Sequence, residues 1–365
     1  MTIAPKDSGS TPDLISKLSN EILRSIQMVK WHGWVSALGA ILLSILIGSL
    51  FLLINGYSPL SAYQNILIGA FGGKFEIGET LLKTTPLLFT GLSVVIAMQA
   101  GLFNIGAEGQ LVIGALATAM VGTINMGFPP VLHASVSLLA GFIAGAIWGG
   151  LAGVIKVHFG AHEVIVTIML NYIALLLTSY LVNYPWKAEG MVPQTNTILP
   201  SAQLFHLIHG SQLSIGIFIG LFIVVFIALF LRKTILGYEI RAVGLNAAAC
   251  ATAGINSNRI GLLAMALAGA VAGIGGGVEV LGVHGRFIQG FSPGFGYDGI
   301  AVAVLANSQP LLVPITAVLF GVLRAGGAYL ERATSIPGDF ALLIQALVIF
   351  FAASPRLFSI LLKRR

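Results

Sequence analysis

The feature that most constrains this chain is a series of long apolar runs that recur from Trp34 to the C-terminus. The runs are about 20 residues long, which is the length an α-helix needs to cross the hydrocarbon core of a bilayer. Only 9% of the residues are charged, whereas a soluble globular domain carries about a quarter. We therefore predict an all-α polytopic membrane protein with one transmembrane domain over residues 34–355.

Ten spans are expected, with boundaries that the apolar content places to within a few residues. The segment 297–309 is the shortest of them and could instead be re-entrant. The expected spans are 34–53, 82–98, 109–124, 131–154, 164–182, 213–231, 260–280, 297–309, 311–329 and 340–355.

Basic residues gather in the segments that ten spans place on one side of the membrane. These residues are Lys156, Arg232, Lys233, Arg241, Arg259 and the last three residues of the tail 356–365. Because Lys and Arg are enriched in cytoplasmic loops, we expect both termini to be cytoplasmic. The net charge of +6 is then a matter of membrane orientation, and no nucleic-acid partner is expected. Residues 1–33 favour an amphipathic helix on the membrane surface, with an unstructured cytoplasmic tail as the alternative.

Two glycine-rich polar stretches interrupt the apolar pattern, at 101–110 and at 290–299. Glycine disfavours helix, and lipid cannot satisfy the polar groups of a broken helix, so each stretch must face protein or water. Interrupted helices of this kind form the midplane site of many transporters. Because the two stretches enter their following helices from opposite sides, we expect an inverted repeat of spans 2–5 and 7–10.

Glycines also recur at four-residue spacing in spans 4 and 7. The two series are Gly141, Gly145, Gly149 and Gly153 in one span and Gly269, Gly273 and Gly277 in the other. This spacing places them on one side of each helix, where backbones can approach closely. Ordinary packing within the chain is the favoured interpretation, and a subunit interface or a moving seam is the alternative.

The interior loop 232–259 connects spans 6 and 7 and is basic. Its segment Leu245–Ala253 is alanine-rich and lies between Gly244 and Gly254, which predicts a short helix with a turn at each end. Such a helix is suited to a groove on another protein. A solvated connector is the alternative.

Together, three segments resemble one transporter family. The pattern Thr234-x-x-Gly237, Arg241-Ala-Val-Gly-x-Asn-x-Ala-Ala249 and Ala253-Gly-Ile255 resembles the coupling loop of ATP-binding-cassette (ABC) permeases of the branched-chain amino acid and ribose type. The stretches Gly101-Leu-Phe-Asn-Ile-Gly-Ala-Glu-Gly-Gln110 and His162-Glu-Val-Ile-Val-Thr-Ile-Met-Leu-Asn-Tyr-Ile173 are similar to the subgroup that imports nucleosides and simple sugars. The resemblance covers about residues 35–355, and the chain looks like the longer of two permease subunits.

The resemblance implies a transport subunit, not an enzyme, in a bacterial cytoplasmic (inner) membrane. The implied partners are a second related permease, a cytoplasmic ATPase with two nucleotide-binding cassettes, and a substrate-binding lipoprotein or periplasmic protein. This chain carries no phosphate-binding loop of the Gly-x-x-x-x-Gly-Lys-[Ser/Thr] type, so ATP and Mg are expected on the partner ATPase. The coupling residues implied are Gly237, Tyr238, Glu239, Arg241, Gly244, Asn246, Ala248 and Gly254.

A nucleoside site needs aromatic side chains for the base and amides or carboxylates for the ribose. The candidates along the substrate pathway are Phe103, Asn104, Glu108, Gln110, Asn171, Glu279, Phe295, Tyr297 and Asp298. Glu108 and Asp298 begin helices, so each could instead cap free N–H groups. We expect no metal site, because His162-Glu163 lacks a second histidine at the required spacing.

Two other functions remain open at this point. Within the same class, the substrate could be a ribose-like sugar or an amino acid. From another class, the chain could be an ion-coupled secondary transporter that uses Glu108 and Glu279, although such a carrier has no use for a coupling loop.

Overall fold

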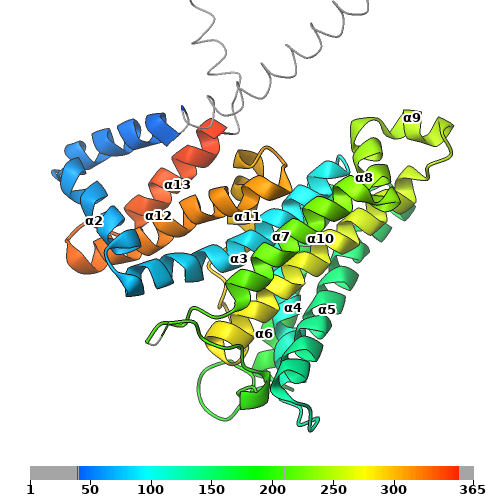
Figure 1. Cartoon of the computed structure of the whole chain (residues 1–365), viewed down its shortest axis with the longest axis horizontal. Coiled ribbons are helices and arrows are strands. Elements are labelled where there is room, and N and C mark those ends of the chain that lie inside the picture. Colours follow the sequence, from blue (N-terminus) through cyan, green and yellow to red (C-terminus); the bar gives the residue numbers. More distant parts are fainter. Residues whose placement is uncertain (1–38, 40, 209, 353–365) are drawn as a thin grey trace, which may run out of the picture.

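The computed structural model describes residue 39 and residues 41–208 and 210–352, and helices make up most of these residues (Figure 1). Among the described residues, six helices are long and apolar enough to cross a membrane. They are α3 (Lys74–Gln99), α5 (Pro130–Phe159), α6 (Glu163–Asn183), α7 (Gly216–Lys233), α10 (Ser257–Glu279) with its π-helical continuation η2 (Val280–His284), and α12 (Val313–Ala333) preceded by the short η3 (Pro310–Leu312). Four shorter apolar helices are Ile41–Ile54, α4 (Ala107–Gly122), α11 (Phe295–Leu305) and α13 (Asp339–Ala352). These helices match the ten expected spans one for one. The predicted segments 1–33 and 356–365 lie outside the described residues.

Some helices are absent from the prediction or begin earlier than expected. Helix α2 (Pro59–Phe71) begins with Pro59 at its first position and is capped by Ser58, whose side chain accepts from Ser61 N–H. It packs against α12, and too few of its residues are apolar to suggest a span. Helix α3 begins at Lys74. The predicted span began only at residue 82, because the polar first turns of this helix lower the local hydropathy.

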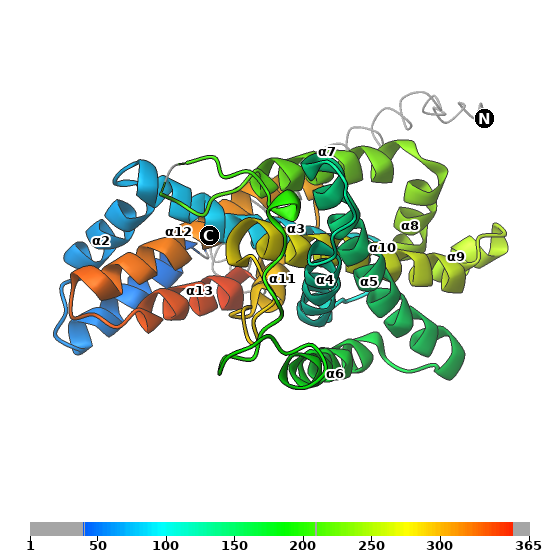
Figure 2. The ribbon, with the colours of Figure 1, turned by 90° about the horizontal axis from the view of Figure 1, so that it is seen from below.

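The two predicted repeats pack in a crossed pattern around α3 and α10, which contact each other (Figure 2). Helix α10 packs on α4 and α5 of the first repeat, and α3 packs on α11 and α12 of the second. Within each repeat, the last helix packs on the half-length helix: α6 packs on α4, and α13 packs on α11. Each repeat therefore uses its first helix to cover the second and third helices of the other.

The two half-length helices run in opposite directions. Helices α8 (Ile235–Leu245) and α9 (Ala247–Thr252) lie at one end of the bundle that contains α7 and α10, and the long loop 184–215 lies at the opposite end of that bundle (Figure 1). Helix α4 ends at this loop, where Gly122 C=O accepts from Leu199 N–H at 2.9 Å. The residues before α11 bond to the same loop, for Phe287 C=O accepts from Thr195 N–H at 2.9 Å. Helix α11 then ends beside α3, close to α8, so α4 and α11 are inverted as predicted.

The glycine series form a seam inside the chain, between α5 and α10. A Cβ atom at Gly145 would lie 2.2 Å from the carbonyl oxygen of Gly269, and one at Gly273 would lie 2.2 Å from that of Gly141. No side chain fits between backbones this close. The favoured interpretation, packing within the chain, is confirmed for these glycines.

Candidate functional site

The N-termini of α4 and α11 meet at one point near the centre of the molecule. A Cβ atom at Gly296 would lie 2.1 Å from the backbone nitrogen of Glu108, so the two helix ends touch through their backbones. The Glu108 carboxylate, which is 2% exposed, accepts from Gly296 N–H at 2.6 Å. Helix N-termini carry free N–H groups and a partial positive charge. Glu108 therefore stabilises two such ends at once: it belongs to the first turn of α4 and caps α11.

The first break, residues 101–106, is held by paired amides. Asn104 Nδ2 donates to Gln110 Oε1 at 2.9 Å, and Gln110 Nε2 donates back to Asn104 Oδ1 at 3.2 Å. Asn104 Oδ1 also accepts from Gly106 N–H at 2.9 Å. Both side chains are buried, so their amide groups bond to other groups of the break and not to solvent.

Asn171 of α6 supports the same break from outside. Its Oδ1 accepts from Gly109 N–H at 2.8 Å, in the first turn of α4, and its Nδ2 donates to Ile105 C=O at 2.9 Å. A second, longer contact of 3.5 Å joins Asn171 Nδ2 to the hydroxyl of Tyr297. This single side chain thus satisfies two backbone groups that the broken helix leaves free.

The second break, residues 285–294, is held by charge. Asp298 in the first turn of α11 accepts from Arg324 Nε at 2.7 Å and Nη2 at 2.5 Å through Oδ2, and from Gln345 Nε2 at 2.5 Å through Oδ1. Arg324 also donates to Pro293 C=O at 3.3 Å and lies over the ring of Phe295. These contacts join α11 to α12 and α13.

Arg324 and Gln345 were not among the predicted site residues. Arg324 is a charged residue inside the expected span 311–329, which is itself a signal for a functional or paired group in a membrane protein. Gln345 gives no comparable signal, because its partner lies 47 positions away in the sequence.

The structure brings most predicted pathway residues to this junction but exposes few of them. Tyr297 is 44% exposed, and Tyr172, which follows Asn171 in α6, is 59% exposed. Phe103 is half-buried and Phe295 is buried. The accessible groups at the junction are therefore aromatic, while most of the amides and carboxylates lie behind them.

Glu279 lies apart from the junction. It occupies the last turn of α10, beyond Gly277, which packs against Thr118 in the second half of α4. Its Oε2 is 3.8 Å from His284 Nε2, and its buried Oε1 has no hydrogen-bond partner. The structure does not join Glu279 to the other candidates.

The predicted coupling segment consists of two capped helices. Thr234 Oγ1 accepts from Gly237 N–H at 3.0 Å to begin α8, and Asn246 Oδ1 accepts from Ala249 N–H at 3.0 Å to begin α9. Helix α9 is the short alanine-rich helix expected from the sequence. Helix α8 was not predicted, because residues 232–244 were expected to form a loop.

The predicted coupling residues divide between the surface and the interior of this segment. Tyr238, Asn246, Ala248 and Gly254 are exposed, as is Leu245, which is 89% exposed and was not predicted. Glu239, Arg241 and Gly244 are half-buried, and Gly237 is buried against α7.

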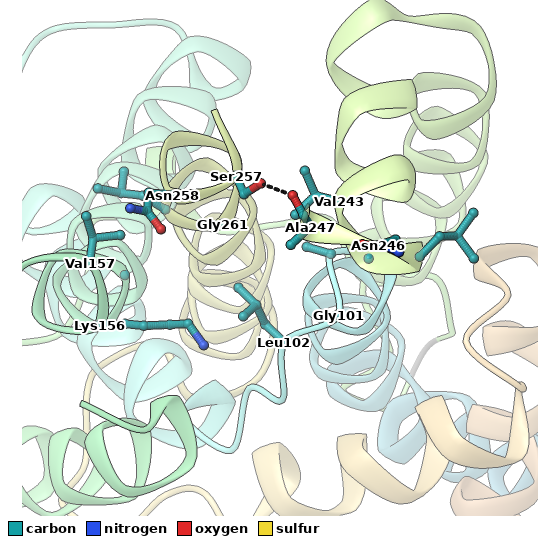
Figure 3. Close-up of a pocket in the computed structure, with 15 residues that line it drawn as sticks. Gly101, Leu102, Lys156, Val157, Val243, Asn246, Ala247, Ser257, Asn258 and Gly261 are labelled. Atoms are coloured by element: carbon teal, nitrogen blue, oxygen red, sulfur yellow. Dashed lines mark hydrogen bonds between the residues drawn. The ribbon is translucent and has the colours of Figure 1, made fainter. Parts of the chain in front are cut away.

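A pocket of about 270 Å³ opens between α8, α9 and the membrane helices (Figure 3). One wall is the end of α3 with Gly101 and Leu102, and another is the start of α10, where Ser257 Oγ donates to Ala247 C=O at 3.0 Å. Lys156 of α5 lines a further wall and donates to Glu163 Oε2 at 2.6 Å.

Comparison with known proteins places this architecture in a family. Residues 77–353 match the family described as the permease component of branched-chain amino acid transport systems. The guanosine ABC transporter permease protein NupP of Bacillus subtilis is 36% identical over 86% of this chain and 91% of its own. The nucleoside ABC transporter permease protein NupB of Lactococcus lactis is 34% identical over 89% and 92%, and the glucose ABC transporter permease protein TsgB13 of Haloferax volcanii is 32% identical over 90% and 89%.

Each of these three organisms contains a second, more distant relative. That of H. volcanii, the putative glucose permease protein TsgC13, is 28% identical over 68% of this chain and 75% of its own. NupQ of B. subtilis, also a guanosine permease protein, is 28% identical over 76% of this chain and 90% of its own. NupC of L. lactis, also a nucleoside permease protein, is 25% identical over 72% and 86%. Relatives of this chain thus occur as pairs of permease subunits. Since the match covers more than half of its length, this chain belongs to the family of permease components of branched-chain amino acid transport systems.

Proposed function

We propose that this chain is one of two membrane subunits of an ABC importer that carries nucleosides. The relatives NupP and NupB, which are named as guanosine and nucleoside permeases, support the substrate class. The pairing of such relatives supports a second, related permease as the partner.

The observation that carries the proposal is the junction of α4 and α11. Broken backbone cannot face lipid, yet this junction exposes Tyr297 and Tyr172 on the surface of the single chain. A partner permease that covers this surface would enclose a cavity with aromatic walls. Flat aromatic side chains stack on a flat base, which suits a nucleoside.

The junction residues then fall into two roles. Tyr297, Tyr172 and Phe103 are accessible, and we assign them to the substrate pathway. The buried residues position the two half-helices: Asn104, Glu108, Gln110, Asn171, Phe295 and Asp298. Glu279 lies apart from both groups and is assigned to neither.

The segment α8–α9 is the proposed docking site for a cytoplasmic ATPase. It projects from one end of the molecule (Figure 1) and presents exposed Leu245 and Ala248, while the exposed basic residues Arg232 and Lys233 end α7 just before it. In this arrangement ATP and Mg bind to the ATPase, both termini are cytoplasmic, and the loop 184–215 faces an extracytoplasmic binding protein. ATP binding and hydrolysis move α8–α9, and the two breaks open the cavity alternately to each side.

The test is uptake into vesicles that contain this chain with its partner permease, ATPase and binding protein. Labelled inosine, uridine, ribose and glucose are compared with ATP, with ADP and with an ion gradient. ATP-dependent uptake of nucleosides that excess ribose does not reduce would support the proposal. Uptake by the chain alone under an ion gradient would contradict the class.

Sugar import is the second candidate, because TsgB13 is named as a glucose permease and is 32% identical to this chain. A sugar has no base to stack on Tyr297 or Tyr172. ATP-driven glucose or ribose uptake without nucleoside uptake would therefore retain the ABC class and replace the substrate.

A further inference from the structure

The end of α3 contacts both the coupling segment and the turn that follows α11. Helix α3 ends at Gln99, and Gly101 follows with a φ of +73°, a left-handed conformation that glycine adopts without strain. The first break begins at this residue. The corner Met98–Gly101 therefore sets the direction in which the chain enters the first break.

Gly244 of α8 lies directly on this corner. A Cβ atom at Gly244 would lie 2.1 Å from the carbonyl oxygen of Gln99 and 2.9 Å from the backbone nitrogen of Gly101. This is backbone against backbone, with no flexible side chain between them. A displacement of α8 towards α3 must therefore move the corner as well.

The side chain of Gln99 extends from the same corner to the other repeat. Its Nε2 donates to Ser308 C=O at 2.6 Å, and Ser308 Oγ lies 3.5 Å from Met98 Sδ. Ser308 follows the end of α11, and both Asn307 and Ser308 have positive φ, at 49° and 55°. Residues other than glycine adopt this conformation at a cost, so the Gln99 hydrogen bond holds a strained turn at the end of the second half-helix.

We infer that the Met98–Gly101 corner is a relay that positions both half-helices in response to the coupling segment, with Gln99 as the positioning residue for α11. This inference rests on the proposed function. The corner acts on the first break through the chain itself and on α11 through the hydrogen bonds that join Gln99 and Met98 to Ser308. The Gln99 bond is the shorter of the two, so one substitution at Gln99 can uncouple α11 from the first break.

The experiment uses the complete importer in vesicles, in a Cys250→Ala background because Cys250 is the single cysteine. Phe103→Cys reports on the first break and Tyr297→Cys on the start of α11. The rate of maleimide labelling at each reporter is measured with and without ATP. In the otherwise unchanged importer, ATP is expected to change the labelling rate at both positions.

Gln99→Met removes the hydrogen bond to Ser308 at similar side-chain volume. We expect it to retain the ATP response at Phe103→Cys and to lose it at Tyr297→Cys, a selective loss that general destabilisation would not produce. Gly244→Ala is expected to lose the response at both reporters. Gly261→Ala is the matched control, because its Cβ would meet Leu102 of the same pocket at an ordinary 3.5 Å; it should keep both responses.

A normal ATP response at Tyr297→Cys in Gln99→Met would overturn the relay, even if Gly244→Ala fails to assemble. Equal losses in Gly261→Ala and Gly244→Ala would overturn the role of the Gly244 contact. A complete lack of ATP response in the unchanged importer would contradict the proposed function itself. Because the reporters respond to ATP rather than to substrate, an importer of sugars would leave this test intact.

Discussion

The two helix breaks occupy equivalent places in the inverted repeats, yet different chemistry holds them. The first break is fixed by neutral amides: the side chains of Asn104 and Gln110 bond to each other, and Asn171 bonds to the backbone of the break. The second is fixed by the ion pair of Asp298 and Arg324 and by Gln345. Buried charges cost far more to separate than neutral amides do. The second half-helix is therefore anchored to α12 and α13 by contacts that tolerate little change, whereas each hydrogen bond at the first break contributes less.

Removing the charge that balances Asp298 should have the largest effect. Arg324→Leu leaves a buried carboxylate without its cation, which costs about 3–5 kcal/mol. Denaturation of the purified chain in detergent micelles measures the loss of stability. The double variant Asp298→Asn with Arg324→Gln should recover much of it, because neither remaining group is charged. Failure of the double variant to recover would show that packing of Arg324 on Phe295, rather than charge, anchors α11.

Glu108 links the two breaks, and its substitution should have the next largest effect. Glu108→Ala leaves Gly296 N–H buried without an acceptor, at a cost of about 1.5–3 kcal/mol. Glu108→Gln retains an oxygen for that N–H and loses only the charge between two helix N-termini. We expect the glutamine variant to be the more stable of the two in the same measurement. Equal stability would mean that the hydrogen bond to Gly296 contributes little.

The amides of the first break should be individually less important. Asn171→Leu removes the hydrogen bonds to Gly109 N–H and Ile105 C=O, and we expect a loss of about 1–2 kcal/mol. Asn65→Leu is the control, because Asn65 is half-buried on α2 and its side chain bonds only within its own helix. A loss at Asn171 as large as that at Arg324 would remove the contrast between the breaks.

The smallest effect is expected for the hydroxyl of Tyr297. Its 3.5 Å contact with Asn171 is too long for a strong hydrogen bond. Tyr297→Phe should therefore change the KM for nucleoside uptake by less than about twofold, which corresponds to under about 0.5 kcal/mol. Tyr297→Ala removes the ring and should raise KM by up to about tenfold, since an aromatic contact contributes about 0.5–1.5 kcal/mol. Equal KM values in the two variants would place the base elsewhere.

The transmembrane helices were predictable because their signal is local. Apolar length alone indicates each of them, and the glycine-broken stretches indicate where helices stop. Helix α2 was missed because Ser61, Gln64 and Asn65 interrupt its apolar residues. Helix α8 was missed because its glycines, Gly237 and Gly244, suggest a loop, whereas the structure uses them for close packing on α7 and α3.

The sequence indicated most of the residues that meet at the junction but not the contacts that they make there. The sequence identified Glu108 as either a pathway residue or a cap, and it begins α4 as expected. It could not show that Glu108 caps α11, because Gly296 is 188 positions away. Arg324 was in principle detectable as a charge inside an apolar span. Gln345 and Gln99 were not, since an amide at a helix end or within an apolar run has no distinctive pattern.

The glycine seam between α5 and α10 determines which parts of the molecule can move. Helices that meet through side chains can slide when rotamers change, but α5 and α10 meet through carbonyl oxygens and Cα atoms and have no such freedom. Together they form one rigid body that extends from the α8–α9 end of the bundle to the loop end. Helix α4 belongs to the same body, because a Cβ atom at Gly114 would lie 2.3 Å from the Cα atom of Gly273. During a transport cycle α4, α5 and α10 would therefore move together.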